Sequence, residues 1–308
     1  MSNVISPSNA LHTEAACPVR WQKQPSSSAA LPRAITKAAS PHSFYTIRLL
    51  VDRGRVNDAF RAYAYFRWVD DSLDSGTLSE AERLAFIQRQ QRLIACCYRG
   101  EVVPNLCAEE QLMADVIHAD PSLDSGLALY IHNLLWVMVF DAHRRGRVIS
   151  EVELTEYSYR LAAAVTESLH YFIGHNADSP HDETRYLAVV GAHITHMLRD
   201  THDDLAAGYF NVPAEILDRH GLTPHDVSSE PYVAWVKSRV VQARDCFAAG
   251  RRYLDRVGSW RCRVAGYAYM ARFEHVLDCI EADGYRLRSS YPELKHRRLV
   301  WHALRQAF

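Results

Sequence analysis

Two groups of carboxylates, far apart in the chain, are the residues best suited to do chemistry. The first comprises Asp70, Asp71 and Asp74. Positions i, i+3 and i+4 share one face of a helix, so Asp70 and Asp74 are expected to be neighbours with Asp71 beside them. Carboxylates packed this closely repel one another, and burying them makes sense only with a compensating cation. The first group therefore indicates a cation site.

The second group repeats this spacing with Asp200, Asp203 and Asp204. Oxygen sites made of a few carboxylates, water and substrate phosphates suit Mg²⁺. Facing each other across a cavity, the two groups are expected to hold two or three Mg²⁺ ions that bridge a diphosphate. Ions in that position stabilise the charge that develops on a departing diphosphate.

The alternative is that each group is a solvated acidic end of a helix. Both groups, however, follow strongly apolar segments, residues 59–69 and 186–198, and each has an arginine just ahead of it, Arg67 or Arg199. A solvated helix end has no need of that arrangement. The sequence therefore favours two groups that bind metal ions.

The elements that must position these acids are helices. Apolar residues recur with the helical period over long stretches such as 126–143, 152–172 and 184–205, and Gly, Pro or Ser clusters separate these stretches. No segment has the alternation of a sheet strand. The pattern predicts an all-α, single-domain bundle of about ten helices around a central cavity, covering residues 41–308. Residues 1–40, rich in Ser, Pro and Ala, are predicted to be a disordered or loosely packed tail.

Composition excludes several other classes of protein. The 308 residues are 48% hydrophobic and 23% charged, and a net charge of −1 gives no reason to expect a nucleic-acid partner. Seven cysteines without a CxxC pair fit a reduced protein better than a disulfide framework or a zinc site. No apolar run is long enough to span a membrane, and the N-terminus lacks a signal-peptide pattern. We expect a cytoplasmic protein, monomeric or homodimeric.

With its context, the first acid group resembles the squalene/phytoene synthase family over residues 62–74, Ala-Tyr-Ala-Tyr-Phe-Arg-Trp-Val-Asp-Asp-Ser-Leu-Asp. Residues 157–162, Tyr-Ser-Tyr-Arg-Leu-Ala, resemble the tyrosine-bearing helix of the family, and residues 196–204, His-Met-Leu-Arg-Asp-Thr-His-Asp-Asp, resemble its second aspartate motif. Asp141 falls where the family keeps an acid. The similarity extends over about residues 43 to 290.

The resemblance implies an all-α isoprenoid synthase fold and a prenyl diphosphate substrate. It implies that the aspartates bind Mg²⁺, four directly and two in support: Asp70, Asp74, Asp200 and Asp204, then Asp71 and Asp203. It further implies that Arg67 and Arg199 contact diphosphate or orient carboxylates. Tyr157 would face the reacting carbons, and Tyr63 would line the substrate pocket.

The chain departs from the family pattern in the predicted pocket. His42 stands where the family has a Lys or Arg that contacts phosphate, and Ala163 and Thr166 replace two glycines that leave room for prenyl chains. His193 and His196 replace Gln and Asn.

Further departures follow the second acid group. An arginine of the family is replaced around residues 207–209, and Asn211 replaces an aromatic residue. These changes remove cationic phosphate contacts, shorten the expected cavity and add polar groups.

If Ala163 and Thr166 line the cavity, Glu167 and His170 on the same helix face should line it too. A buried acid and imidazole suit a polar partner better than two hydrocarbon chains. We therefore expect one prenyl group to pass to an aromatic acceptor of secondary metabolism, with Glu167, His170 or His196 as the base that removes the ring proton. The family includes such prenyltransferases, some acting on carbazoles. The alternatives are a structural ion pair for Glu167 with a neighbouring arginine, and core packing for His170 and His193.

Three rival functions stay open at this point. A head-to-head synthase would join two prenyl diphosphates, without another acceptor, in a cavity about 20 Å or more deep. A class I terpene cyclase would consume one diphosphate alone. A degenerate scaffold subunit would have no reason to keep buried acidic groups.

Overall fold

The computed structural model describes residues 30–175 and 177–291. Within these ranges the chain is helical and has no strand, only one isolated bridge between Val148 and Phe210. The α-helices are α1 (Ala30–Ala39), α2 (Pro41–Leu50), α3 (Val56–Asp74), α4 (Glu80–Tyr98), α5 (Ala108–Ala119), α6 (Gly126–Arg144), α7 (Glu151–Phe172), α8 (Leu187–Arg199), α9 (Thr201–Ala207), α10 (Ala214–His220), α11 (Glu230–Leu254) and α12 (Trp260–Ala282). A short 3-10 turn, Arg53–Arg55, precedes α3. The predicted all-α bundle is confirmed.

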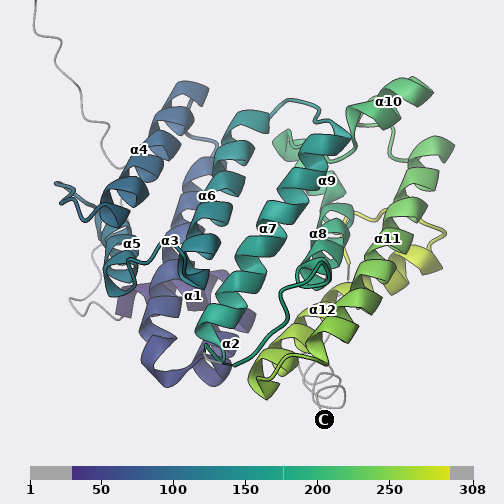
Figure 1. Ribbon diagram of the computed structural model, residues 1–308. Coiled ribbons are helices and arrows are strands. Elements are labelled where there is room, and N and C mark those ends of the chain that lie inside the picture. Colours follow the sequence, from purple (N-terminus) through teal and green to yellow (C-terminus); the bar gives the residue numbers. More distant parts are fainter. Residues whose placement is uncertain (1–29, 176, 292–308) are drawn as a thin grey trace, which may run out of the picture.

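Long helices form the body of the bundle. Helices α6 and α7 run side by side through its centre, with α3, α4 and α5 on one side and α8, α11 and α12 on the other (Figure 1). Residues of α3 such as Tyr65 and Trp68 are almost completely buried. Helices α8 and α11 pack so closely that a Cβ atom on Gly250 would lie 2.6 Å from the Cβ of Ala188. The core thus fixes α3, α7 and α8, the helices that carry most of the predicted site.

Local signals in the sequence explain where these helices begin and end. Ser150 and Glu153 form a capping box at the start of α7, which satisfies free N–H groups of the first turn. Gly208 ends α9 with a φ of +86°, a backbone conformation that glycine adopts without strain. The predicted stretch 184–205 is divided at Asp200 (φ −97°, ψ 8°) into α8 and α9. The second acid group therefore straddles a bend.

The N-terminal prediction needs a correction. Residues 30–39, predicted to belong to the tail, form α1, which packs against α2 and α3 and buries Pro32 and Thr36. Its residues include Ala, Leu and Ile at helical spacing, and this short pattern was hidden by the Ser and Pro content upstream. The rest of the predicted tail, residues 1–29, lies outside the described residues. Among the described helices, none combines the length and apolar character needed to cross a membrane.

Candidate active site

The last turns of α3 present the first acid group beside Arg67. The guanidinium of Arg67 pairs with Asp71 and lies 3.4 Å from a carboxylate oxygen of Asp70. Loss of surrounding water and the nearby charge of Asp74 raise the pKa of Asp70 to about 7. Desolvation also raises the pKa of Asp74. The carboxylates of this group thus repel one another.

The second acid group sits where α8 passes into α9. Arg199 donates two hydrogen bonds of 2.6 Å to Asp200, and Nε2 of His196 lies 2.8 Å from the same carboxylate. Burial alone would raise the pKa of Asp200, but these contacts hold it well below its usual range. Burial and the charge of Asp200 raise the pKa of Asp204 to about 6. Asp203 is exposed to solvent.

One loop brings the two acid groups to the same end of the bundle. The α9–α10 loop is attached to the α6–α7 loop by a hydrogen bond of 2.7 Å from Gly146 N–H to Gly208 O. On that loop, the Tyr209 hydroxyl lies 3.4 Å from Asp74, and the Asn211 amide donates to Asp204 at 2.7 Å. Residues two positions apart therefore touch one acid of each group.

A buried chain of polar side chains lies behind the acids. Tyr157 of α7 donates to Asp141 at 2.9 Å, and Arg144 of α6 donates to the same carboxylate at 2.6 Å. The other end of the Arg144 guanidinium donates to Asn211 at 2.9 Å. Arg144 is only 5% exposed. Tyr157 was predicted to face the reacting carbons. In the structure its hydroxyl is hydrogen-bonded to Asp141, near the acid groups.

The donor set fits Mg²⁺. All six predicted ligands are aspartates, and Mg²⁺ is bound in proteins by one or two carboxylates together with water and substrate phosphates. Among the described residues, no three His, Cys, Asp or Glu side chains already enclose a position for a metal ion. Arg67 adds a buried Nε–H that lacks a hydrogen-bond partner among the described residues.

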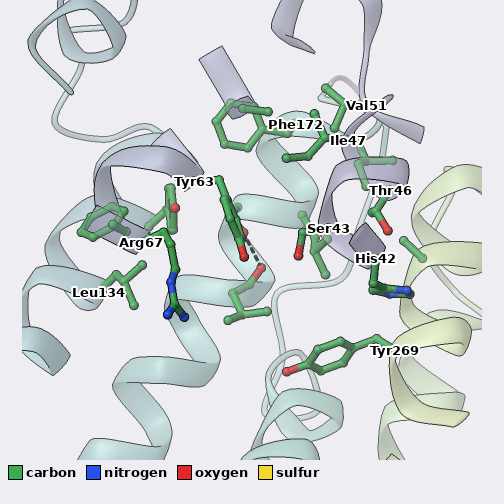
Figure 2. Close-up of a pocket in the computed structure, with 18 of the residues that line it drawn as sticks. His42, Ser43, Thr46, Ile47, Val51, Tyr63, Arg67, Leu134, Phe172 and Tyr269 are labelled. Atoms are coloured by element: carbon green, nitrogen blue, oxygen red, sulfur yellow. Dashed lines mark hydrogen bonds between the residues drawn. The ribbon is translucent and has the colours of Figure 1, made fainter. Parts of the chain in front are cut away.

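A cavity of about 430 Å³ opens from the first acid group into the bundle. Figure 2 shows Ile47, Val51 and Phe172 gathered at one end of it and Arg67 on its wall. Asp70 lines the cavity as well. The remaining lining includes predicted residues, aromatic rings and one further cation: His42, Tyr63, Phe66, Tyr130, Tyr269 and Arg272. An apolar chamber thus adjoins acids and guanidinium groups.

The prediction for the α7 face is wrong. The α7 residues that line the cavity are Val165, Ser168, Leu169 and Phe172. The set predicted to line it begins two positions earlier than the observed set and comprises residues 163, 166, 167 and 170. A shift of two residues corresponds to a rotation of about 200° around the helix axis. The structure therefore turns those side chains toward the opposite side, away from the cavity.

Glu167 forms the structural ion pair that was its alternative interpretation. Arg185 donates two hydrogen bonds to it, at 2.7 and 3.0 Å, and both side chains are about 5% exposed. Tyr186 donates a third, at 2.9 Å. Ala163 and Thr166 are buried on the same face. A carboxylate held by three donors away from the cavity is not available as a base there.

The three predicted histidines have different surroundings. His170 lies between helices, 2.8 Å from the Tyr253 hydroxyl, and burial lowers its pKa to about 4. His193 is 4% exposed and packs against the ring of Tyr157. Burial and nearby cations hold its pKa well below the usual range. Only His196, half exposed beside Asp200, presents an accessible imidazole.

Several functional candidates were missed by the sequence. Arg144, Tyr209, Tyr269 and Arg272 contact the acids or line the cavity. Arg144 carried a signal, because it stands three positions after Asp141 and thus on the same helix face. Tyr209 directly follows the helix-breaking Gly208. Tyr269 and Arg272 lie in the C-terminal half of the chain, where the sequence shows no motif.

Known proteins resemble this chain over most of its length. The family model described as squalene/phytoene synthase matches residues 37–305. A presqualene diphosphate synthase from Rhodopseudomonas palustris is 27% identical over 230 residues, which are 73% of this chain and 78% of that protein.

Two solved structures share the fold. A dehydrosqualene synthase in complex with a ligand superposes with a TM-score of 0.70 at 17% identity, covering 91% of this chain and 95% of that one. The squalene synthase HpnC from Alicyclobacillus acidocaldarius gives 0.68 at 20% identity, covering 85% and 95%. The all-α architecture is thus that of the isoprenoid synthases.

Proposed function

The chain belongs to the squalene/phytoene synthase family of prenyltransferases, and from that premise we propose that it ionises one allylic prenyl diphosphate with Mg²⁺ and transfers the prenyl group to a small aromatic acceptor. The observation that carries the proposal is the chamber of about 430 Å³ beside the acids. Its size supports one prenyl group and one compact partner.

Volume and length both support this limit. A cavity of about 430 Å³ is at the small end of the range of roughly 300–1,000 Å³ for small-molecule pockets, which favours one prenyl group over two long chains. The part of α3 that lines the cavity runs from Ala59 to Asp70, eleven positions, which corresponds to about 16 Å along the helix. A tunnel for two long chains was expected to exceed that length. A five- or ten-carbon prenyl group beside an aromatic ring is a closer match.

The residues around the acids have distinct tasks in this reaction. Asp70, Asp74, Asp200 and Asp204 would hold Mg²⁺, which supplies charge neutralisation for the departing diphosphate. Arg67 donates from the cavity wall to the diphosphate oxygens.

The other residues act on the cation and the ring proton. The carbon–oxygen bond of the donor breaks, and the rings of Tyr63, Tyr130 and Tyr269 stabilise the allyl cation through their π faces. A ring carbon of the acceptor forms the new carbon–carbon bond and loses its proton. Of the three predicted bases, His196 keeps an accessible imidazole; it does not line the cavity but lies beside Asp200 of the second acid group, and there it is the proposed proton acceptor.

A second candidate is the condensation of two prenyl diphosphates. It is favoured by the relative of this chain that is named a presqualene diphosphate synthase. Glu167 and His170 do not line the cavity, so the polar side chains that favoured a different acceptor in the sequence do not act there. The two candidates share the ionisation step and differ in the nucleophile.

One assay separates the candidates. The protein is incubated with Mg²⁺ and prenyl diphosphates of five, ten, fifteen or twenty carbons, with and without a panel of electron-rich aromatic compounds, and products are identified by mass spectrometry. We expect an adduct only when an aromatic compound is present. A thirty- or forty-carbon product made without an acceptor would instead establish the second candidate, and a cyclised product of one diphosphate alone would contradict both. His196→Gln should slow adduct formation, whereas Glu167→Gln should not change the product.

A further inference from the structure

We propose that Arg144 is a positioning residue that links Asp141 to Asn211 and, through Asn211, orients Asp204 of the second acid group. This inference rests on the metal-dependent function proposed above. Arg144 touches neither the cavity nor Asp204 directly, so its effect on the metal site would pass through the side chains it orients.

The hydrogen bonds form one continuous chain. The Tyr157 hydroxyl donates to one oxygen of Asp141, and Nε of Arg144 donates to the other, at 2.9 and 2.6 Å. The terminal nitrogen of Arg144 donates to Oδ1 of Asn211 at 2.9 Å, and Nδ2 of Asn211 donates to Asp204 at 2.7 Å. The path joins α7, α6, the α9–α10 loop and α9. It ends on a carboxylate that we assign to the metal ions.

Arg144 determines which way the Asn211 amide faces. An amide presents an acceptor on one side and two donors on the other. Because the guanidinium of Arg144 only donates, it must face the amide oxygen, and this leaves the amide N–H groups directed at Asp204. With Arg144 removed, nothing in this chain of contacts would hold the amide in that orientation. Asp204 would then lose an aligned hydrogen-bond donor.

The surroundings of Arg144 leave it little freedom. Its guanidinium carbon lies 4.8 Å from the centre of the Tyr157 ring and 5.0 Å from that of Tyr209. With 5% exposure, the side chain is fixed between two aromatic rings as well as by its hydrogen bonds. A lysine ammonium cannot reproduce this planar contact with two partners at once. Arg144 also sets the position of Tyr209, which contacts Asp74 of the first group.

Asn211 completes the path to the second acid group. Its amide oxygen accepts from Arg144 and its amide nitrogen donates to Asp204, which an apolar side chain at this position could not do. The arginine and the asparagine therefore work as a pair. Their loss should weaken metal binding, since partners that orient metal ligands typically contribute 10- to 100-fold in affinity or activity.

The test compares four variants of the full chain: Arg144→Met, Arg144→Lys, Asn211→Leu and the double variant Arg144→Met/Asn211→Leu. Calorimetry measures the binding of Mg²⁺ together with inorganic diphosphate, and thermal unfolding reports stability separately. We expect binding to weaken roughly tenfold or more in each single variant, with Lys restoring only part of it. The double variant should bind no more weakly than Arg144→Met, because both changes break the same chain of contacts.

Arg185→Met is the matched control, since it removes another buried arginine paired with a carboxylate. It should lower the unfolding temperature and leave Mg²⁺-dependent diphosphate binding unchanged. The inference is overturned if folded Arg144→Met binds Mg²⁺ and diphosphate within about twofold of the unaltered protein. If Arg144→Met does not fold, Asn211→Leu decides in the same way. An unaltered protein that binds diphosphate without any dependence on Mg²⁺ would refute the proposed function itself, and the inference with it.

Discussion

Among the described residues, two arginines with buried guanidinium groups each pair with a carboxylate, and their surroundings give the two pairs opposite roles. Arg144 and Asp141 are near the acid groups, whereas Arg185 and Glu167 lie on the far side of α7. The guanidinium of Arg185 donates hydrogen bonds to Glu167, a serine hydroxyl, the Pro180 carbonyl and the Tyr253 hydroxyl. These partners lie on α7, on α11 and in the segment between α7 and α8, and none of them belongs to an acid group.

The hydrogen bonds of the Arg144 pair, by contrast, continue to the second acid group. Its chain of hydrogen bonds ends on Asp204, a carboxylate whose pKa is raised to about 6 by burial and by the charge of Asp200. The chemical groups are the same in both places, and only the end point of the network differs. A buried charged residue therefore indicates function only when its contacts lead to a group that still needs a partner.

The largest expected effect concerns that end point. Asp204→Asn should reduce prenyl transfer on the order of a thousandfold, because a neutral amide cannot replace a carboxylate that binds Mg²⁺. Steady-state turnover measured over a range of Mg²⁺ concentrations provides the test. The substitution should not lower the unfolding temperature in metal-free buffer, since it removes repulsion from Asp200. Retention of a tenth or more of the activity would show that Asp204 is not a metal ligand.

A substitution in the Arg185–Glu167 pair should instead lower stability and leave activity unchanged. Glu167→Gln leaves the Arg185 charge buried without a counter-charge, and breaking such a pair destabilises a protein by about 3–5 kcal/mol. Chemical denaturation measures the loss, and activity at a temperature where the variant is folded should stay near that of the unaltered protein. Glu101→Gln is the control, because its pair with Arg99 is exposed and should contribute nothing measurable. Equal stability of Glu167→Gln and Glu101→Gln would contradict the structural role.

Sequence reasoning succeeded where the signal was local. The spacing of apolar residues predicted helices at 126–143 and 152–172, and the structure has Gly126–Arg144 and Glu151–Phe172. Motif spacing also predicted the acid groups. The bend at Asp200 was missed, because no glycine or proline marks it. Local patterns thus fixed the helices but not a change of direction within them.

The errors arose where distant residues decide the outcome. Both faces of α7 carry apolar residues, so periodicity alone could not tell which one faces the cavity. That choice depends on Arg185, 18 positions after Glu167. The pairing of Arg144 with Asn211 spans 67 positions and depends on two loops meeting. Such contacts between distant parts of the chain are products of the tertiary fold.

The free energy of unfolding should also depend on pH, by a moderate amount, through the buried side chain of His170. The folded protein holds the pKa of His170 at about 4, below the value near 6.5 of an unfolded chain. The unfolded state therefore binds more protons between these values, and this residue makes the protein less stable as the pH falls from about 6.5 to 4. In His170→Phe, the loss of unfolding free energy between pH 7 and pH 5 should be smaller by up to about 2 kcal/mol. Denaturation curves whose pH dependence is the same in both proteins would contradict this origin.

The smallest expected effect tests the orientation of α7 itself. The Thr166 hydroxyl is buried with no hydrogen-bond partner among the described residues. Replacing such a group with an apolar one of similar shape is close to neutral or slightly stabilising, so Thr166→Val should change the unfolding free energy by less than about 1 kcal/mol. Ser168→Val, on the cavity face, should alter the Michaelis constant for the substrates instead. If Thr166→Val changed that constant and Ser168→Val did not, the face that holds the substrates would be the one carrying Glu167, and the contrast between the two regions would fail.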